Sequence, residues 1–414
     1  MESPLQLSSV KYQKDAYITV EGKSNADRFF IIQQGKVAIS KEVEVAKEEN
    51  KILNPGDFFG VISTMSGHNH IETAQALTEV VMIAVQKDQY GALIQKNSLV
   101  AMKIITQFSR RLRFLNETLA GISMKKTAEA GPDHLFEVAE YYFSQKQYGK
   151  AIHIFNRYIV HSPDGKKVNT AKERIGSLKS QAIGSIKEVE TKPNDLKRTY
   201  PKDYLLFVEG EPGDELFIIQ KGSVKITKIT SDNEVLLAVL KAGDIFGEMA
   251  LLEGKPRAAT AMAYDDCEVM VINKANFEQM IQTQPQLIAR VTGLLADRIW
   301  LIYRQLANTL INDPVGRVYD SLFIQLEKNK VPLTEPKPYT FSFGQWELAN
   351  MVGLPEKEAK PVLAAFLENK KIEIIEGKIH CTSVPEIVKM AEYYRKMDKI
   401  KKAQAKSQQE RAQS

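Results

Sequence analysis

The chain has 414 residues, of which 43% are hydrophobic and 26% charged, a balance typical of globular proteins with about two to four domains. Its 56 lysines and arginines against 51 aspartates and glutamates leave a net charge of +5, too small to indicate nucleic-acid binding without a local basic cluster. Cys267 and Cys381 lie far apart and have no partners at metal-ligand spacing, which excludes a disulfide framework and favours a reducing cytoplasm. Without a signal peptide or a long apolar run in the sequence, we expect a cytoplasmic protein that does not enter a membrane.

An internal repeat organises the chain. The repeated segments are Phe30–Gly35 with Phe217–Gly222, and Asn54–Gly60 with Lys241–Gly247. Their common offset is 187 residues, the separation of Gly60 and Gly247. Short β-rich runs separated by Gly-Asp and Pro-Gly turns predict an antiparallel jelly-roll barrel in each copy. We therefore expect an α+β multidomain chain, with barrels at residues 1–120 and 188–284.

Between the two copies, residues 131–186 resemble one tetratricopeptide helix pair. The positions at that spacing are Leu135, Val138, Ala139, Tyr142, Ala151, Phe155, Tyr158 and Pro163. A further amphipathic helix over about residues 166–184 is expected to cap the pair. Because such repeats usually need about three units for stability, this one must pack on its neighbours or on a partner. It is either a helical spacer, which we favour, or a peptide-binding groove for a protein partner.

The second copy contains residues suited to a sugar-phosphate ligand. Gly247 and Glu248 lie at one end of a short stretch, and Arg257, Ala258 and Ala259 lie at the other. A ribose hydroxyl needs a carboxylate acceptor, and a phosphate needs a guanidinium and exposed backbone N–H donors, which a short helix after the glycine supplies. A lone arginine inside a barrel is costly, so the motif indicates an occupant. The alternative is that Glu248 and Arg257 merely pair with each other.

This stretch resembles the phosphate-binding cassette of the cyclic-nucleotide-binding domain family, which reads F-G-E-x-A-L with a downstream R-[AST]-A. The matching residues are Phe246, Gly247, Glu248, Ala250, Leu251, Arg257 and Ala259. The resemblance implies that a cyclic nucleotide binds here, also against Met249 and Ala258, with Glu248 on the ribose 2′-hydroxyl and Arg257 on the cyclic phosphate. Ala258 stands where cGMP-selective relatives carry threonine, so the expected ligand is cAMP rather than cGMP.

The first copy keeps the turns and loses these side chains. The positions of Glu248, Arg257 and Ala259 are occupied by Val61, His70 and Glu72. An aliphatic cannot accept from the ribose, and a carboxylate repels the phosphate. We predict that the first barrel binds no cyclic nucleotide and that His70 is a surface histidine without a task. The alternative is that His70 becomes protonated and recruits another anion.

A long helix is predicted over residues 285–311, with apolar residues at helical spacing from Ile288 to Leu310. A helix of this length needs a second surface to cover it, and we expect a homodimer through it. Tyr303 is a candidate to stack on the purine of the nucleotide. Alternatively, Ile302 covers the base, or both side chains pack in the helix interface.

Residues 312–390 follow the order helix, turn, helix and β-rich wing, and residues 391–414 form a charged tail. From about residue 192 to 390 the chain resembles the catabolite-activator (Crp/Fnr) family, with the hinge aspartate at Asp313. The resemblance implies a dimer whose winged helices bind DNA under control of the nucleotide. The basic tail is expected to be a solvated helix that frays into disorder, or to bring nucleic acid close.

The predicted recognition helix departs from the Crp/Fnr family. The base-reading positions carry Glu356, Lys357, Glu358, Lys360 and Pro361. Acidic side chains repel phosphates, and Pro361 removes a backbone donor and favours a kink. Either Lys357 and Lys360 bind the DNA backbone with little specificity, or the winged helix binds a protein. The chain is thus a cAMP-responsive transcription regulator or a cAMP receptor acting through protein partners. Enzyme, catalytic and metal-site motifs are not found.

Overall fold

The computed structural model describes residues 7–24, 26–41, 51–123, 133–178, 195–229 and 234–413. The chain divides into two compact units. One unit consists of Met1–Ser8 and Val85–Ala296, and the other of Ser9–Ala84 and Asp297–Ser414. Among the described residues, no helix is both long and apolar enough to span a membrane.

The first repeat forms two four-stranded sheets around one hydrophobic core. One sheet has the order β1 (Ser8–Tyr12), β8 (Val80–Gln86), β3 (Arg28–Gln34) and β6 (Phe58–Phe59); the other has β2 (Tyr17–Thr19), β7 (Thr73–Ala76), β4 (Val37–Ser40) and β5 (Ile52–Leu53). A short helix, α1 (Val61–Ser66), follows β6. Bulky apolar side chains on β3, such as Phe30 and Ile32, point into the core.

The second repeat has the same strand order, and all of its strand pairs are antiparallel. One sheet is β9 (Lys197–Tyr200), β16 (Cys267–Asn273), β11 (Glu215–Lys221) and β14 (Ile245–Phe246); the other is β10 (Leu205–Phe207), β15 (Thr260–Ala263), β12 (Ser223–Ile229) and β13 (Glu234–Lys241). Phe217 pairs with Phe246 in the register in which Phe30 pairs with Phe59. The ring centroids lie 5.1 Å apart in the second repeat and 5.2 Å apart in the first. The predicted pair of jelly-roll-like barrels is confirmed.

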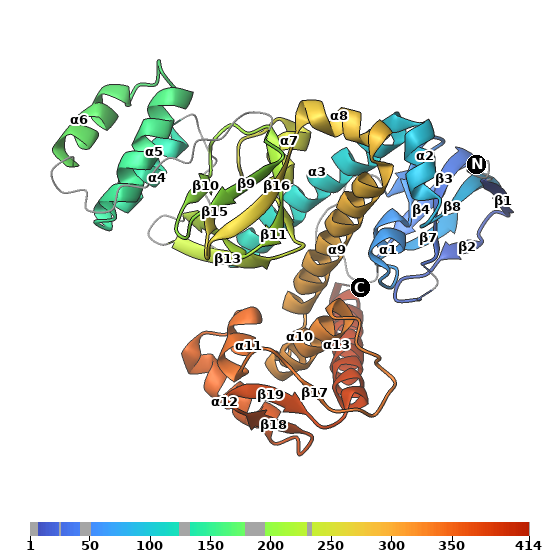
Figure 1. The fold of residues 1–414 in the computed structure, drawn as a ribbon. Helices are drawn as coiled ribbons and strands as arrows, with labels where there is room; N and C mark the ends of the chain where they lie inside the picture. The colour runs from blue at the N-terminus through green and yellow to red at the C-terminus, as the bar shows by residue number, and fades with distance from the viewer. Residues whose placement is uncertain are drawn as a thin grey trace. The chain divides into compact units, whose positions relative to one another are not determined.

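The helical segment between the repeats packs on the second barrel (Figure 1). Its helices are α4 (His134–Ser144), α5 (Tyr148–His161) and α6 (Val168–Leu178). The apolar positions predicted for a helix pair, including Tyr142 and Phe155, share one core with Leu205, Val208 and Met262 of the barrel. The segment therefore covers its apolar face on its neighbour, as expected for a single repeat. The end of the helix predicted over about residues 166–184 lies outside the described residues.

Helices also follow each barrel. They are α2 (Tyr90–Lys96) and α3 (Ser98–Ser123) after the first, and α7 (Glu248–Glu253), α8 (Lys274–Thr283) and α9 (Pro285–Thr309) within and after the second. Helix α3 packs against α7, and α2 packs against α8. The hydroxyl of Tyr90 lies 3.1 Å from the Thr292 hydroxyl in a buried contact. The apolar stripe of α9, from Ile288 to Leu306, is buried within the single chain.

The carboxyl-terminal region combines four helices with a three-stranded sheet. The helices are α10 (Pro314–Lys328), α11 (Gln345–Met351), α12 (Glu356–Leu367) and α13 (Val384–Gln413), and the sheet has the order β17 (Tyr339–Thr340), β19 (Lys378–Cys381), β18 (Ile372–Ile375). Asp313 caps α10, because its carboxylate accepts from the backbone N–H groups of Val315 and Gly316. Pro361 lies inside α12, and the helix continues past it.

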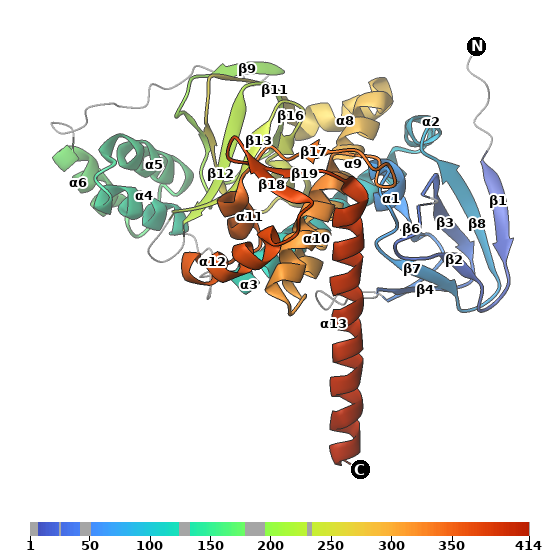
Figure 2. The same cartoon turned by 90° about the horizontal axis from the view of Figure 1, so that it is seen from below.

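The charged tail is helical, and from Lys399 onward its described residues are exposed, as predicted for a solvated helix. Residues 391–413 continue α13 as one helix (Figure 2). Arg395 forms an ion pair with the buried carboxylate of Asp320 on α10. Asp398 accepts from the backbone and the side chain of Asn312, at 3.1 and 2.8 Å. The part of the tail up to Asp398 is therefore packed on the carboxyl-terminal region, and residues 390 and 391 lie within one continuous helix.

Candidate functional site

The candidate site of the second barrel is built around a glycine with a left-handed backbone conformation. Gly247 has φ 78° between β14 and α7, and Gly60 has φ 80° at the matching point of the first barrel. A side chain at Gly247 would also meet its neighbours, since a Cβ would lie 2.8 Å from Nη1 of Arg257 and 3.2 Å from the carbonyl oxygen of Glu215. Glycine is therefore required both by the backbone conformation and by the arginine beside it.

Arg257 lies inside the barrel with 6% of its surface exposed. Its Nη1 donates to the carbonyl oxygens of Glu215 and Gly247, both at 2.7 Å. The guanidinium carbon also lies 4.2 Å from the centroid of the Phe207 ring, within range of a cation–π interaction. The protein itself thus partly compensates the buried cation, so Arg257 is not the lone charge that the sequence argument for an occupant assumed.

Burial lowers the pKa of Arg257, and nearby carboxylates, Glu211 first and then Glu215 and Glu248, act against that shift. Glu248 itself is 1% exposed. The structure therefore brings Glu248 and Arg257 into one buried electrostatic site, as their spacing predicts. Phe246, Met249 and Ala250 of the cassette are buried, whereas Ala258 is exposed and Ala259 is half-buried.

Two residues at this site were missed by the sequence reasoning. Gly213 lies against the guanidinium, since a Cβ there would be 2.3 Å from Nε of Arg257. Glu211, with 3% of its surface exposed, accepts the backbone N–H of Arg257 at 2.7 Å through its own carbonyl oxygen. The signal available in the sequence is the run from Glu209 to Asp214, which places three acids and two glycines beside the apolar strand β10.

The comparisons with known proteins agree with this geometry. The family model of the cyclic nucleotide-binding domain matches residues 9–97 and 197–284. The cAMP-activated global transcriptional regulator CRP of Pasteurella multocida is 31% identical over 181 residues, which cover 43% of this chain and 86% of that protein. The chain belongs to the Crp/Fnr family.

Other members of the Crp/Fnr family are similar over the same share of the chain. The CRP-like cAMP-activated global transcriptional regulator of Mycobacterium tuberculosis is 28% identical over 180 residues, covering 43% of this chain and 80% of that protein. Among solved structures, a CRP/FNR-family transcriptional regulator from Thermus thermophilus is 20% identical, with a TM-score of 0.35, covering 47% of this chain and 98% of that chain. In the present chain the cyclic nucleotide-binding domain model matches two separate segments.

In this Crp/Fnr chain the first cassette is buried but chemically altered. Val61, His70 and Glu72 are 2%, 3% and 9% exposed. The prediction that His70 lies at the surface is therefore wrong: the turn that places Arg257 inside the second barrel also places His70 inside the first. The backbone N–H of His70 donates to Lys23 at 3.0 Å, and Gly22 donates to His70 at 2.8 Å. In the second repeat, Gly210 and Glu211 make the same pair of backbone hydrogen bonds with Arg257.

Tyr303 is buried among residues of the first repeat. Its hydroxyl lies 3.4 Å from Oε1 of Glu21, and Nζ of Lys41 lies 4.9 Å from its ring centroid. Ile302 is also buried, at 6% exposure. These contacts join Tyr303 to the first repeat of the same chain, and both the purine-lid role of Tyr303 and its packing in a helix interface stay predictions.

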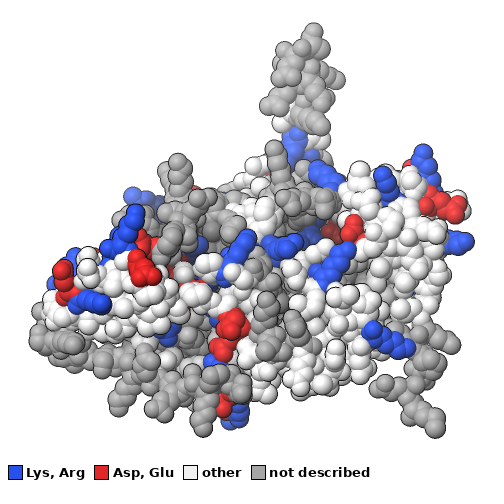
Figure 3. All heavy atoms as spheres, turned by 90° about the horizontal axis from the view of Figure 1, so that it is seen from above, with Lys and Arg blue, Asp and Glu red and all other residues white. Residues whose placement is uncertain are grey.

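The candidate DNA-binding residues of this Crp/Fnr chain, Lys357 and Lys360, are exposed on α12. On the face drawn in Figure 3, the described lysines and arginines are scattered singly among acidic and uncharged residues. Within the described ranges, no three His, Cys, Asp or Glu side chains are grouped to hold a metal ion. Cys267 and Cys381 are buried thiols, and burial raises the pKa of Cys267 to about 11.

Proposed function

We propose that the protein is a cAMP-responsive transcription regulator that binds one nucleotide in its second barrel. The observation that carries the proposal is the buried Arg257, held beside the buried carboxylate of Glu248 at a left-handed glycine turn. The guanidinium of Arg257 would donate to the cyclic phosphate, and Glu248 would accept from the ribose 2′-hydroxyl. Membership of the Crp/Fnr family supports this assignment, and Ala258 favours cAMP over cGMP.

The test is calorimetric titration of the full-length chain with cAMP and with cGMP. We expect saturable binding with cAMP tighter than cGMP. Arg257→Ala should weaken cAMP binding by about 100-fold, because it removes a charge-assisted contact to the phosphate, and Glu248→Gln by about tenfold. His70→Ala, at the matching position of the first barrel, is the control and should bind as wild type does. Equal affinity of Arg257→Ala and wild type would remove the proposal.

The output of the regulator is proposed to be the carboxyl-terminal region acting as a winged helix. Helices α11 and α12 followed by the β18–β19 hairpin support this assignment, and the exposed Lys357 and Lys360 are the proposed phosphate contacts. Because lysine contacts to phosphates release the counterions held by DNA, binding should fall with salt. A gel-shift experiment with mixed genomic fragments, at two salt concentrations and with or without cAMP, tests this output.

The second candidate is a cAMP receptor that acts through protein partners. The specific observation in its favour is the surface of α12, where the exposed Glu358 and the internal Pro361 stand in the family's base-reading positions. A chain that binds cAMP and shifts no DNA fragment at any salt concentration would support this candidate over the first.

A homodimer through residues 285–311 also belongs to the proposal, but its geometry needs revision. The apolar stripe expected to form the interface is already buried within one chain. A second copy would have to use the remaining faces of α9 or displace the groups that cover the stripe. Sedimentation of the full chain with and without cAMP would decide, and a monomer under both conditions would remove the dimer from the proposal.

A further inference from the structure

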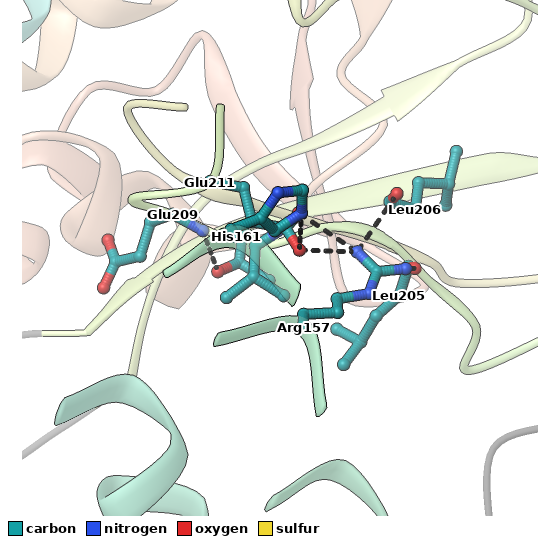
Figure 4. A network of polar contacts seen from close by, with 8 residues as sticks. Arg157, His161, Leu205, Leu206, Glu209 and Glu211 are labelled. Atoms are coloured by element: carbon teal, nitrogen blue, oxygen red, sulfur yellow. Dashed lines mark hydrogen bonds and ion pairs between the residues drawn. The ribbon is translucent and has the colours of Figure 1, made fainter. Parts of the chain in front are cut away.

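An arginine of the helical segment forms an ion pair with one loop of the nucleotide barrel. Arg157, on α5, donates through Nη1 to both carboxylate oxygens of Glu211, at 3.1 and 3.0 Å. Its Nη2 donates to the carbonyl oxygen of Leu205 at 2.9 Å. Figure 4 shows the guanidinium between the two ends of this loop, and Nε2 of His161 also lies 3.9 Å from Oε1 of Glu211. One side chain therefore holds both ends of the segment from Leu205 to Glu211.

Helix α4 contacts the same loop from its first residue. Nε2 of His134 lies 3.2 Å from Oε1 of Glu209, and the same oxygen accepts the backbone N–H of Ile229 at 3.1 Å. Gly210 has φ 86°, and a Cβ on it would lie 3.1 Å from Cδ2 of His134. Both the backbone conformation and the close approach of α4 require glycine at this point. Helix α4 therefore contacts the loop at Glu209 and Gly210, and helix α5 contacts it at Leu205 and Glu211.

The loop is joined directly to the arginine of the cassette. Gly210 donates its backbone N–H to the carbonyl of Arg257 at 2.9 Å, and the backbone N–H of Arg257 donates to the carbonyl of Glu211 at 2.7 Å. Glu211 also closes the turn on itself, since Oε2 accepts the backbone N–H of Val208 at 2.7 Å. Glu211 thus binds Arg157 through its side chain and Arg257 through its main chain.

The first repeat shows that this turn does not need the acid. There, Gly22 has φ 80° and makes the same backbone exchange with His70, and Lys23 stands in the place of Glu211. The carboxylate is present in the repeat whose neighbour supplies an arginine. Removing Arg157 would leave the buried carboxylate of Glu211 without its cation, and an uncompensated buried charge strongly destabilises a fold.

We propose that Arg157 is a positioning residue of the nucleotide site: by holding the Leu205–Glu211 loop, it sets the place of Arg257 and so the affinity for the cyclic phosphate. The inference rests on the proposed function. It assigns the helical segment a role beyond that of a spacer. Because coupling between sites is reciprocal, nucleotide binding must in turn stabilise the contact between helix α5 and the loop.

The test uses Arg157→Ala and Arg157→Lys in the full-length chain, with Tyr142→Phe as the matched control. The control removes a partly buried hydrogen bond of 2.9 Å to Glu234 in the same helix–barrel interface, but on strand β13. We expect Arg157→Ala to weaken cAMP binding by about tenfold. The cAMP affinity of Arg157→Lys should lie between those of wild type and Arg157→Ala, and that of Tyr142→Phe should stay within about twofold of wild type. Wild-type affinity in Arg157→Ala, or an equal loss in Tyr142→Phe, overturns the proposal.

A second readout needs no nucleotide. Hydrogen exchange should quicken in peptides covering residues 205–213 and 254–260 of Arg157→Ala and stay unchanged there in Tyr142→Phe. Unchanged exchange around Arg257 in Arg157→Ala overturns the proposal. If the wild-type chain binds neither cAMP nor cGMP, the proposed function fails, and exchange alone then decides whether Arg157 holds Arg257. If Arg157→Ala does not fold, Arg157→Lys carries both readouts, because it keeps the charge and loses the fork.

Discussion

The guanidinium of Arg257 lies against the backbone of Gly213, so close that a Cβ at Gly213 would be 2.3 Å from Nε and 2.5 Å from Cζ. These two residues are 44 positions apart, the separation of 213 and 257, and they come together because β11 and the cassette face the same interior. The absence of a side chain at Gly213 thus fixes where the positive charge of the barrel resides.

Gly213→Ala is therefore expected to displace the guanidinium and weaken cAMP binding by about tenfold, or about 1.4 kcal/mol. The fold should lose little stability, since the atoms met by the new methyl group belong to the end of a flexible side chain. Calorimetry and thermal unfolding of the same samples measure the two effects. Gly176→Ala, in the exposed part of α6, meets no atom within 4 Å and should leave affinity unchanged. Unaltered affinity in Gly213→Ala would contradict the prediction.

The buried state of Val61 and His70 bears on whether the first barrel can be made to bind. We expect Val61→Glu with His70→Arg, made in the Arg257→Ala background, to show no saturable cAMP binding, because Glu72 still faces the phosphate position. The double change should also lower the melting temperature, since it introduces charges at positions 2% and 3% exposed. Titration and melting curves check both statements. The informative partner variant adds Glu72→Ala to these changes. Saturable cAMP binding by the variant that still carries Glu72 would refute the role given to Glu72.

Arg395 is expected to be important for the stability of the carboxyl-terminal region. Asp320 is 2% exposed and also accepts from the Asn308 amide at 2.9 Å, so Arg395→Ala would leave a buried carboxylate without its cation. The loss should be about 3 kcal/mol in the free energy of unfolding, measured by urea denaturation. Lys401→Ala, on the exposed side of the same helix, should change stability by less than about 0.5 kcal/mol. Similar values for the two variants would show that the tail contributes nothing through this pair.

His153 gives the helical segment a predictable response to pH. Burial, together with the nearby Arg157, lowers the pKa of His153 from 6.5 to about 4. A histidine whose pKa is lower in the folded state stabilises the fold above pH 6.5 and loses that contribution as pH falls toward 4, by up to about 1.4 kcal/mol per pH unit. The decrease in melting temperature from pH 7 to pH 5 should be larger in wild type than in His153→Gln. Parallel curves would mean that His153 is not the titrating group.

Both barrels and the cassette were predictable because each leaves a local pattern. Turns of the Pro-Gly-Asp and Ala-Gly-Asp type recur at a fixed offset, and the fifteen residues from Phe246 to Thr260 carry glycine, glutamate and arginine in one short run. Local backbone geometry follows from such runs, as the nearly equal φ angles of Gly60 and Gly247 show.

The remaining features depend on contacts between distant residues. Arg157 and Glu211 are 54 positions apart, and neither belongs to a recognisable spacing, so their ion pair leaves no trace in the sequence pattern. The burial of His70 was missed because residue type was given more weight than its place in a repeated turn. The packing of the first part of the tail could not be predicted for a related reason: a lysine-rich composition does not indicate the few side chains, such as Arg395 and Asp398, that contact Asp320 on α10 and Asn312 just before it.

The altered pocket of the first barrel has a consequence for the shape of the dose response. If the first barrel binds no nucleotide, as we predict from the buried Val61, His70 and Glu72, a single polypeptide offers one effector position, and its occupancy should rise hyperbolically with effector concentration. Any sigmoidal output, with a Hill coefficient above one, would then have to arise from association between polypeptides, not from communication between the duplicated halves of one.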